Sequence, residues 1–206
     1  MIKKSSSQIL KIDRETMNDN IEKAYRVLAD RKIIIFPTDT AFGIGCLATE
    51  GDAVKKVFDI RKRPHTQAVP VLFSSVEMLR EYVLEFPREV QDLTDKYWPG
   101  ALTVILPANM KKIPSIVTGG GASVGVRIPR HNDAIALIEK LGSPIIAPSA
   151  NFHGDPTPFK LSDLNPNLIN LIDYVLPGVC TLKKESTVID CTHLPWKIIR
   201  QGAVEI

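Results

Sequence analysis

Short runs of β-branched and apolar residues alternate with helical patterns along most of this chain of 206 residues. A helix between two strands returns the chain to the same sheet, so this order predicts an α/β fold in which helices flank one twisted, open sheet. The final predicted strands have no helical pattern between them, which favours a mixed sheet over a purely parallel one. The predicted strands lie within residues 33–36, 68–73, 98–106, 124–128, 144–151, 174–177, 186–190 and 196–202.

Amphipathic helical spacing separates the earlier strands. The predicted helices are residues 20–31, 52–63, 76–83, 88–96 and 132–142. Asn18 or Asp19 is expected to cap the first and Asp52 the second, which ends before Pro64, while Gly142 ends the last. Residues 152–170 are rich in Pro, Asn and Asp, and we expect an irregular excursion there.

Composition is that of an ordinary globular chain, with 44% hydrophobic and 24% charged residues and a net charge of +3. We expect one domain at residues 14–206, preceded by an extension at residues 1–13. The 3 cysteines have neither disulfide-framework nor zinc-site spacing. No apolar run is long enough for a membrane span and the N-terminus lacks a secretory pattern, so a cytoplasmic location without membrane contact is expected.

Several common enzyme motifs are missing from the sequence. There is no G-x-x-x-x-G-K-[ST], no G-x-G-x-x-G after a strand and no H-E-x-x-H, which excludes the standard nucleotide and zinc motifs. Ser149 lies in APSAN rather than in G-x-S-x-G, so a hydrolase nucleophile elbow is not indicated. No other residue has the pattern of a nucleophile or a tuned base.

Small polar residues and arginines lie instead at the ends of predicted strands, where open α/β sheets bind ligands. They are Thr38, Thr40, Arg127, Ser149, Asn151, Ser186, Thr187 and Arg200. Singly, each is explained by a hydroxyl or Asx turn, a solvated helix end or a flexible loop. Together they favour a site for a polar anion, with arginines and the backbone N–H groups of Gly119–Gly121 facing phosphate oxygens. Such a site would catalyse phosphoryl or adenylyl transfer by positioning and charge stabilisation.

The motifs around these residues occur in a distinctive order. They read FPTDTAFGIG, IRKRP, AVPVL, WPGALTVIL, VGVRIPRH, APSANFHGDPTP, STVID and IIRQGAV. In this order the chain resembles the YrdC/Sua5 family of threonylcarbamoyl-AMP synthases over residues 33–203. The resemblance implies a YrdC-like twisted sheet with a large concave, electropositive cavity. It also implies condensation of L-threonine, bicarbonate and ATP to L-threonylcarbamoyladenylate and pyrophosphate, for the N6-threonylcarbamoyladenosine (t6A) modification of tRNA.

The resemblance also implies roles for individual residues. L-threonine would contact Thr40, Arg127, Ser149 and Ser186. ATP would contact Arg63, Gln67, Ser123, Asn151 and Arg200. Mg²⁺ is expected to accompany ATP without a dedicated protein ligand, since Mg²⁺ relies on phosphate oxygens and few carboxylates. No catalytic residue is identified, and Arg61 and Arg63 would act through positioning and charge stabilisation.

Four positions depart from the family's pattern. Arg61 stands where lysine is usual, Phe42 where tyrosine is usual, Gln67 where lysine or asparagine is common, and His153 where serine is usual. The resemblance implies a short, single-domain form covered by its own residues 152–170, and downstream proteins that transfer the product to tRNA, so that tRNA contact is indirect. Two other interpretations stay open: an RNA-binding module, and a paralogue of the same fold without synthase activity.

Overall fold

The computed structural model describes residues 19–206. Its first helix spans residues 19–29, so the first predicted helix is present, whereas the cap at Asn18 and the boundary after residue 13 lie outside the described residues. The helices that follow are α2 (Gly51–Arg61), α3 (Val76–Arg80), α4 (Arg88–Tyr97), α5 (Asn132–Leu141) and α6 (Pro166–Ile169). The strands are β1 (Ile34–Phe36), β2 (Gly43–Gly45), β3 (Val71–Leu72), β4 (Leu102–Pro107), β5 (Ser123–Arg127), β6 (Ile145–Ile146), β7 (Tyr174–Val175), β8 (Thr187–Asp190) and β9 (Lys197–Arg200).

The described strands form two sheets where the sequence predicts one. Their orders are β2-β1-β7 and β6-β3-β5-β4-β8-β9. Both sheets are mixed, as predicted, because β1 and β4 each have one parallel and one antiparallel neighbour. The prediction of a single sheet is wrong, because β2 and β6 belong to different sheets. The chain segments around them form no continuous ladder and are joined by two isolated bridges, Gly43 with Ser149 and Leu47 with Ile145, and by backbone hydrogen bonds such as Ile44 N–H to the Pro148 carbonyl oxygen at 2.9 Å. The sheets nevertheless approach closely, since a Cβ on Gly45 would lie 2.5 Å from the carbonyl oxygen of Ile146.

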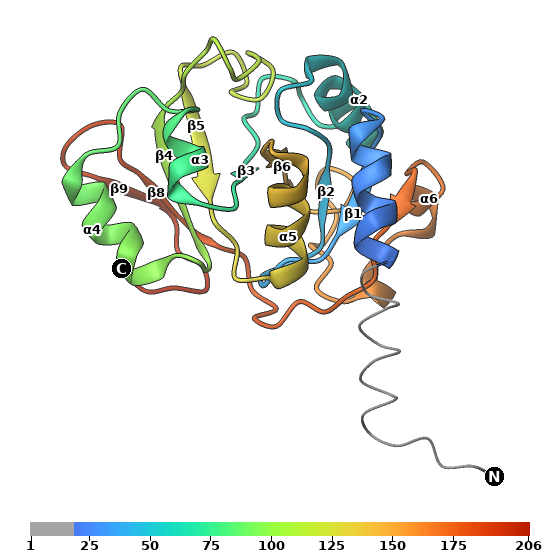
Figure 1. Cartoon of the computed structure of the whole chain (residues 1–206). Coiled ribbons are helices and arrows are strands. Elements are labelled where there is room, and N and C mark those ends of the chain that lie inside the picture. Colours follow the sequence, from blue (N-terminus) through green and yellow to red (C-terminus); the bar gives the residue numbers. More distant parts are fainter. Residues whose placement is uncertain (1–18) are drawn as a thin grey trace.

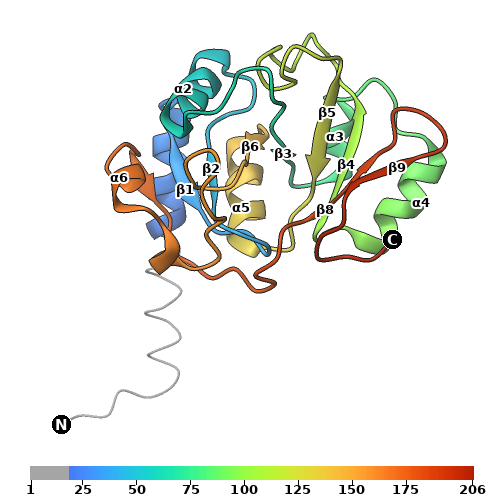
Figure 2. The ribbon, with the colours of Figure 1, turned by 180° about the vertical axis from the view of Figure 1, so that it is seen from behind.

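Helices cover one face of the six-stranded sheet. Figure 1 shows α3, α4 and α5 in front of this sheet, and Figure 2 shows β4, β5 and β8 coming forward when the molecule is seen from behind. A large buried cluster includes Phe58, Phe73 and Leu102, and a second cluster joins Leu28 of the first helix to Leu137 of α5. These side chains are almost fully buried, so the apolar cores fix the strands whose polar ends form the site described below.

The ends of α2 differ from the sequence prediction. Its N-cap is Glu50, which makes no side-chain capping bond, so the capping role predicted for Asp52 is wrong. Asp52 instead lies in the first turn, where the helix dipole favours a carboxylate. The helix ends at Arg61 because Lys62 takes a left-handed conformation, with φ 55° and ψ 35°. This turn leaves Arg61 buried and Lys62 exposed.

The other connections agree with expectation. Helix α5 ends at Gly142, whose φ of 60° is left-handed. Residues 152–170 are irregular apart from a 3₁₀ turn at Leu161–Asp163 and the short α6. Within residues 19–206, no helix combines the length and apolar character that crossing a membrane requires.

Candidate active site

A cavity of about 310 Å³ is lined by residues from both sheets. This volume is at the lower end of the range for small-molecule sites, roughly 300–1,000 Å³. Its polar and charged lining comes from stretches of chain that are distant in sequence. These residues are Thr38, Thr40, Arg63, Thr103, Ser123, Arg127, Ser149, Thr157, Glu185, Ser186 and Arg200.

The hydroxyl of Thr38 organises the turn after β1. Its Oγ1 donates to the carbonyl oxygen of Ala41 at 2.7 Å and accepts from the backbone N–H groups of Thr40 and Ala41, each at 3.2 Å. Thr38 is therefore a turn-forming residue, as one interpretation of the PTDT sequence predicts. The turn places the Thr40 hydroxyl 3.0 Å from that of Thr38, in the cavity wall.

Arg127, at the end of β5, is held by three hydrogen bonds that its guanidinium donates to other residues. Its Nε donates to the carbonyl oxygen of Gly100 at 2.9 Å, its Nη1 donates to Thr40 Oγ1 at 2.8 Å, and its Nη2 pairs with Asp39 Oδ1. The side chains of Arg127 and Asp39 are 6% and 2% exposed, so this is a buried ion pair. Burial lowers the pKa of Arg127, and the charge of Asp39 opposes that effect. The second carboxylate oxygen of Asp39 has no hydrogen-bond partner among the described residues.

Arg61 joins the end of α2 to the strand end that carries Ser149 and Asn151. Its Nε donates to the Asn151 carbonyl oxygen at 2.8 Å, and its Nη2 donates to Asn151 Oδ1 at 2.9 Å and to Ser149 Oγ at 3.4 Å. Ser149 Oγ donates to Asn151 Oδ1 at 2.7 Å. Burial, with a smaller contribution from neighbouring Arg63, lowers the pKa of Arg61 to about 10. Nη1 is buried without a partner in the described structure, so this cation retains an unused donor.

Arg63 lines the cavity and has donors to spare. Its Nη2 donates to the carbonyl oxygen of Ala68 at 2.9 Å, and its Nε is buried without a partner among residues 19–206. Burial lowers its pKa. No ion pair within that range involves Arg61 or Arg63. Two neighbouring cations without carboxylate partners make this corner suited to an anionic ligand.

A second cluster surrounds Arg200 at the end of β9. Arg200 donates from Nε to the Ser186 carbonyl oxygen at 3.0 Å and from Nη2 to Ser186 Oγ at 3.2 Å. Its Nη1 lies 2.9 Å from Glu185 Oε2, and Glu185 Oε1 accepts from Thr157 Oγ1 at 2.9 Å. The hydroxyls of Thr103 and Ser186 are 2.9 Å apart. The strand ends of β8 and β9 are thus joined to residues 152–170 at one side of the cavity.

Gly202 fixes the distance between β9 and the chain that leads into β8. A Cβ at this position would lie 2.4–2.5 Å from backbone atoms of Glu185 and Ser186. We expect Gly202→Ala to lower the free energy of unfolding by about 1–3 kcal/mol, because the backbone must move to accept the methyl group. Urea unfolding measures the effect. Gly51→Ala is the matched control, since its Cβ would make only ordinary contacts with Pro114 at 3.6–3.9 Å. Equal stability of the two variants would contradict this account.

Most residues predicted to bind substrates lie together, while their roles remain predictions. The cavity lining includes Thr40, Arg127, Ser149, Ser186, Arg63, Ser123 and Arg200. Asn151, Arg61 and Gln67 lie outside the lining, and Asn151 is hydrogen-bonded to Arg61. The sequence did not single out Thr103, Thr157 or Glu185. The polar Thr103 within an otherwise apolar strand was a usable signal for one of them.

The glycine-rich loop does not cradle an anion, contrary to expectation. The backbone N–H groups of Gly119, Gly120 and Gly121 donate to carbonyl oxygens of Ile116, Ser115 and Thr118 at 3.3, 2.9 and 3.2 Å. They are therefore unavailable to phosphate oxygens. Gly119 is required for packing, since it has a φ of +63° and its Cβ would lie 2.6 Å from the carbonyl oxygen of Thr66.

Neither a thiolate nor a metal cluster supplies a reactive centre in the described chain. Burial raises the pKa of Cys46 and of Cys191 to about 12 and also raises the pKa of Cys180, so all three are protonated thiols at neutral pH. Residues 19–206 contain no group of three His, Cys, Asp or Glu side chains able to hold a metal ion. The chemistry that the cavity offers is hydrogen bonding and positive charge.

The fold and this cavity define an α/β protein whose hydroxyl and arginine side chains, set at strand ends, suit a small polar anion. The Sua5/YciO/YrdC family model, described as "Telomere recombination", matches residues 26–202, and the chain belongs to this family. The threonylcarbamoyl-AMP synthases of Pyrococcus abyssi and Bacillus subtilis are 36% and 34% identical to it over 87% and 93% of its length. The Xanthomonas euvesicatoria enzyme of the same name is 35% identical over 77% of the chain.

Solved structures give the same result for the fold. The crystal structure of P. abyssi Sua5 complexed with L-threonine has a TM-score of 0.85 and 36% identity, covering 88% of this chain and 54% of that one. Escherichia coli YciO has a TM-score of 0.79 at 24% identity, with 88% of each chain covered, which bears on the fold alone. The chain spans about half the length of the first relatives it matches, 53% of the P. abyssi and 56% of the B. subtilis protein. It covers 86% of the X. euvesicatoria protein.

Proposed function

We propose that the chain is an L-threonylcarbamoyladenylate synthase, which condenses L-threonine, bicarbonate and ATP and releases pyrophosphate for t6A modification of tRNA. Support comes from relatives named threonylcarbamoyl-AMP synthase and from a solved relative complexed with L-threonine. The observation that carries the proposal is a single cavity that brings together Thr40, Arg127 and Ser149 with Arg63 and Arg200. Hydroxyls suit a small amino acid, and arginines suit its carboxylate and a triphosphate.

The hydroxyl protons indicate how threonine would be oriented. The Thr38 proton is directed to the Ala41 carbonyl oxygen, and Thr38 Oγ1 accepts two backbone N–H groups, which uses its hydrogen-bonding capacity. Thr40 Oγ1 accepts from Arg127, and the Ser149 proton is directed to Asn151. Ser149 therefore faces the cavity as an acceptor, which suits the ammonium or hydroxyl donors of threonine. The threonine carboxylate would then lie toward the guanidinium of Arg127.

The arginines would serve the nucleotide. Arg63 lines the cavity with an unused Nε donor, and Arg200 adds another guanidinium to the lining. Arg61 lies outside the lining and adds positive charge beside Arg63. In the proposed step, the carboxylate oxygen of N-carboxythreonine attacks the α-phosphorus of ATP, and the bond to the β-phosphate bridging oxygen breaks to release pyrophosphate. Positive charge fixed before the reaction stabilises the negative charge that develops on the phosphates. We further propose that Mg²⁺ accompanies ATP on its phosphate oxygens, because the described lining holds a single carboxylate, Glu185, and Mg²⁺ needs few protein ligands when phosphates bind it.

The remaining parts of the proposal concern the cell. The adenylate would pass to separate proteins that transfer the threonylcarbamoyl group to tRNA, so any contact of this chain with tRNA would be indirect. A cytoplasmic location remains a prediction from the sequence. An RNA-binding module and a paralogue without synthase activity are outcomes that the following test would reveal.

Pyrophosphate release tests the proposal. We expect purified protein with ATP and Mg²⁺ to release pyrophosphate only when both L-threonine and bicarbonate are present, with an adenylate of the expected mass in the reaction. L-serine and omission of the amino acid are the controls for specificity. Folded protein that releases no pyrophosphate under any of these conditions would overturn the synthase proposal. RNA binding at moderate salt without pyrophosphate release would favour the RNA-binding interpretation.

A further inference from the structure

Glu185 is an unexpected side chain in a cavity that otherwise offers positive charge. The charged side chains in the described lining are Arg63, Arg127, Arg200 and Glu185. A carboxylate there repels a phosphate, and the proposed synthase reaction gives it no step to perform. Its contacts therefore require an explanation.

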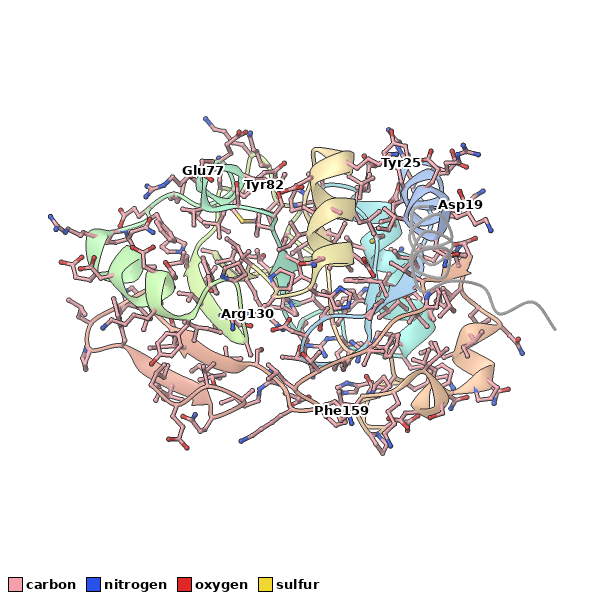
Figure 3. The ribbon with its side chains drawn as sticks, turned by 60° about the horizontal axis from the view of Figure 1, so that its bottom comes forward. Asp19, Tyr25, Glu77, Tyr82, Arg130 and Phe159 are labelled. Atoms are coloured by element: carbon pink, nitrogen blue, oxygen red, sulfur yellow. The ribbon has the colours of Figure 1, made fainter. Side chains whose placement is uncertain are left out.

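Both oxygens of Glu185 are engaged by segments that lie far apart in the sequence. Oε1 accepts from Thr157 in the irregular segment 152–170, and Oε2 pairs with Arg200 at the end of β9, each at 2.9 Å. The side chains of Arg200 and Glu185 are 43% and 39% exposed. A pair that is this accessible to water can separate, unlike the buried pair of Arg127 and Asp39. In Figure 3, Phe159 marks the segment that Thr157 belongs to, at the lower edge of the view.

The other contacts of Arg200 show what Glu185 contributes. Nε and Nη2 donate to Ser186, which holds one edge of the guanidinium in place. Nη1 is left for Glu185. An anion that reaches Nη1 from the cavity meets the negative charge of Glu185 at the same nitrogen, and two anions compete for it.

We propose that Glu185 is an exchangeable counter-ion of Arg200. It orients Arg200 while the cavity is empty, gives up Nη1 to a phosphate group of the ligand, and in doing so releases Thr157 and loosens residues 152–170. Glu185 is then a positioning residue and not a catalytic one. This inference rests on the proposed function, because the anion is the triphosphate of ATP or the pyrophosphate that it yields.

The test uses inorganic pyrophosphate in EDTA, so that neither turnover nor a metal ion contributes. Calorimetric titration should show that Glu185→Gln binds pyrophosphate about fivefold more tightly than the unmodified protein, since the amide no longer competes as an anion. Glu50→Gln is the matched control, because Glu50 also pairs with an arginine, Arg31 at 3.5 Å, but lies outside the cavity lining. It should leave the affinity unchanged.

Hydrogen exchange supplies a readout that altered stability alone would not give. In the unmodified protein, pyrophosphate should speed exchange of backbone amides in residues 152–170. In Thr157→Val, which removes the bond to Glu185, exchange there should be fast already and should not respond to pyrophosphate. An unchanged or weaker affinity of Glu185→Gln, or exchange in the unmodified protein that ignores pyrophosphate, would overturn the counter-ion role alone. Failure of the unmodified protein to bind pyrophosphate or ATP would overturn the proposed function as well.

Discussion

Replacing Arg127 by alanine is expected to lower the free energy of unfolding by about 3–5 kcal/mol, as removal of one partner from a buried ion pair does. The guanidinium pairs with Asp39 and also donates to Gly100 and Thr40. Its loss would leave the Asp39 carboxylate 2% exposed with no cation beside it, and one carboxylate oxygen already lacks a partner among the described residues. Urea denaturation followed by circular dichroism measures the change. The dependence of the unfolding free energy on urea concentration should be the same in the variant and the unmodified protein if both unfold in two states.

A second substitution shows whether the loss of stability comes from the unpaired charge of Asp39 or from a general loss of packing. Asp39→Asn combined with Arg127→Ala should recover at least half of the lost stability, because the amide has nearly the same shape and no charge. A loss below about 1 kcal/mol in Arg127→Ala, or no recovery in the double variant, would contradict the ion-pair account. For kinetics, Arg127→Lys is the better variant, since it keeps a cation beside Asp39. It should raise the KM for threonine more than the KM for ATP.

The features of this protein that could be predicted are those that depend on residues close together in the sequence. Hydrophobic spacing indicated α4 and α5 to within about one residue, and polar residues at strand ends indicated Thr40, Arg127 and Ser149 as neighbours in one site. Local pattern cannot decide which backbone groups pair across long distances. It therefore missed strand β2 and the division of the strands into two sheets. It also gave Gly119–Gly121 an anion-binding role, although their N–H groups are used within the loop.

Counter-ions were harder still to predict. Asp39 adjoins Thr40 in the sequence, but its partner Arg127 lies on another strand of the other sheet. Glu185 likewise reads as a surface carboxylate after two lysines until the fold places it beside Arg200. The two pairs differ in exposure, because the pair of Arg127 and Asp39 is buried whereas that of Arg200 and Glu185 is open to water. The sequence around neither pair indicates which of the two is buried and which is exposed.

Arg63 is the arginine whose replacement should separate binding from stability. It lines the cavity, has an unused buried Nε, and pairs with no carboxylate within residues 19–206, so its charge is available to a ligand. A charge-assisted hydrogen bond contributes about 1.5–3 kcal/mol, so Arg63→Ala should weaken ATP binding roughly 10- to 150-fold. Because the side chain of Arg63 makes a single hydrogen bond to the described protein, to the carbonyl oxygen of Ala68, the free energy of unfolding should change by less than about 1 kcal/mol. This is the reverse of the pattern expected for Arg127.

Calorimetric titration of ATP into the unmodified protein, Arg63→Ala and Arg63→Lys checks this expectation. Lysine should recover part of the affinity, because it restores the charge but not the planar fork of donors. Arg26→Ala controls for net charge, since Arg26 is on the first helix, with a side chain 74% exposed in its pair with Glu22. ATP affinity that falls equally in Arg63→Ala and Arg26→Ala would mean that the nucleotide senses only the overall charge of the protein. A fall confined to Arg63, with unfolding unchanged, would locate the phosphates beside Arg63, a cavity-lining arginine that pairs with no carboxylate among residues 19–206.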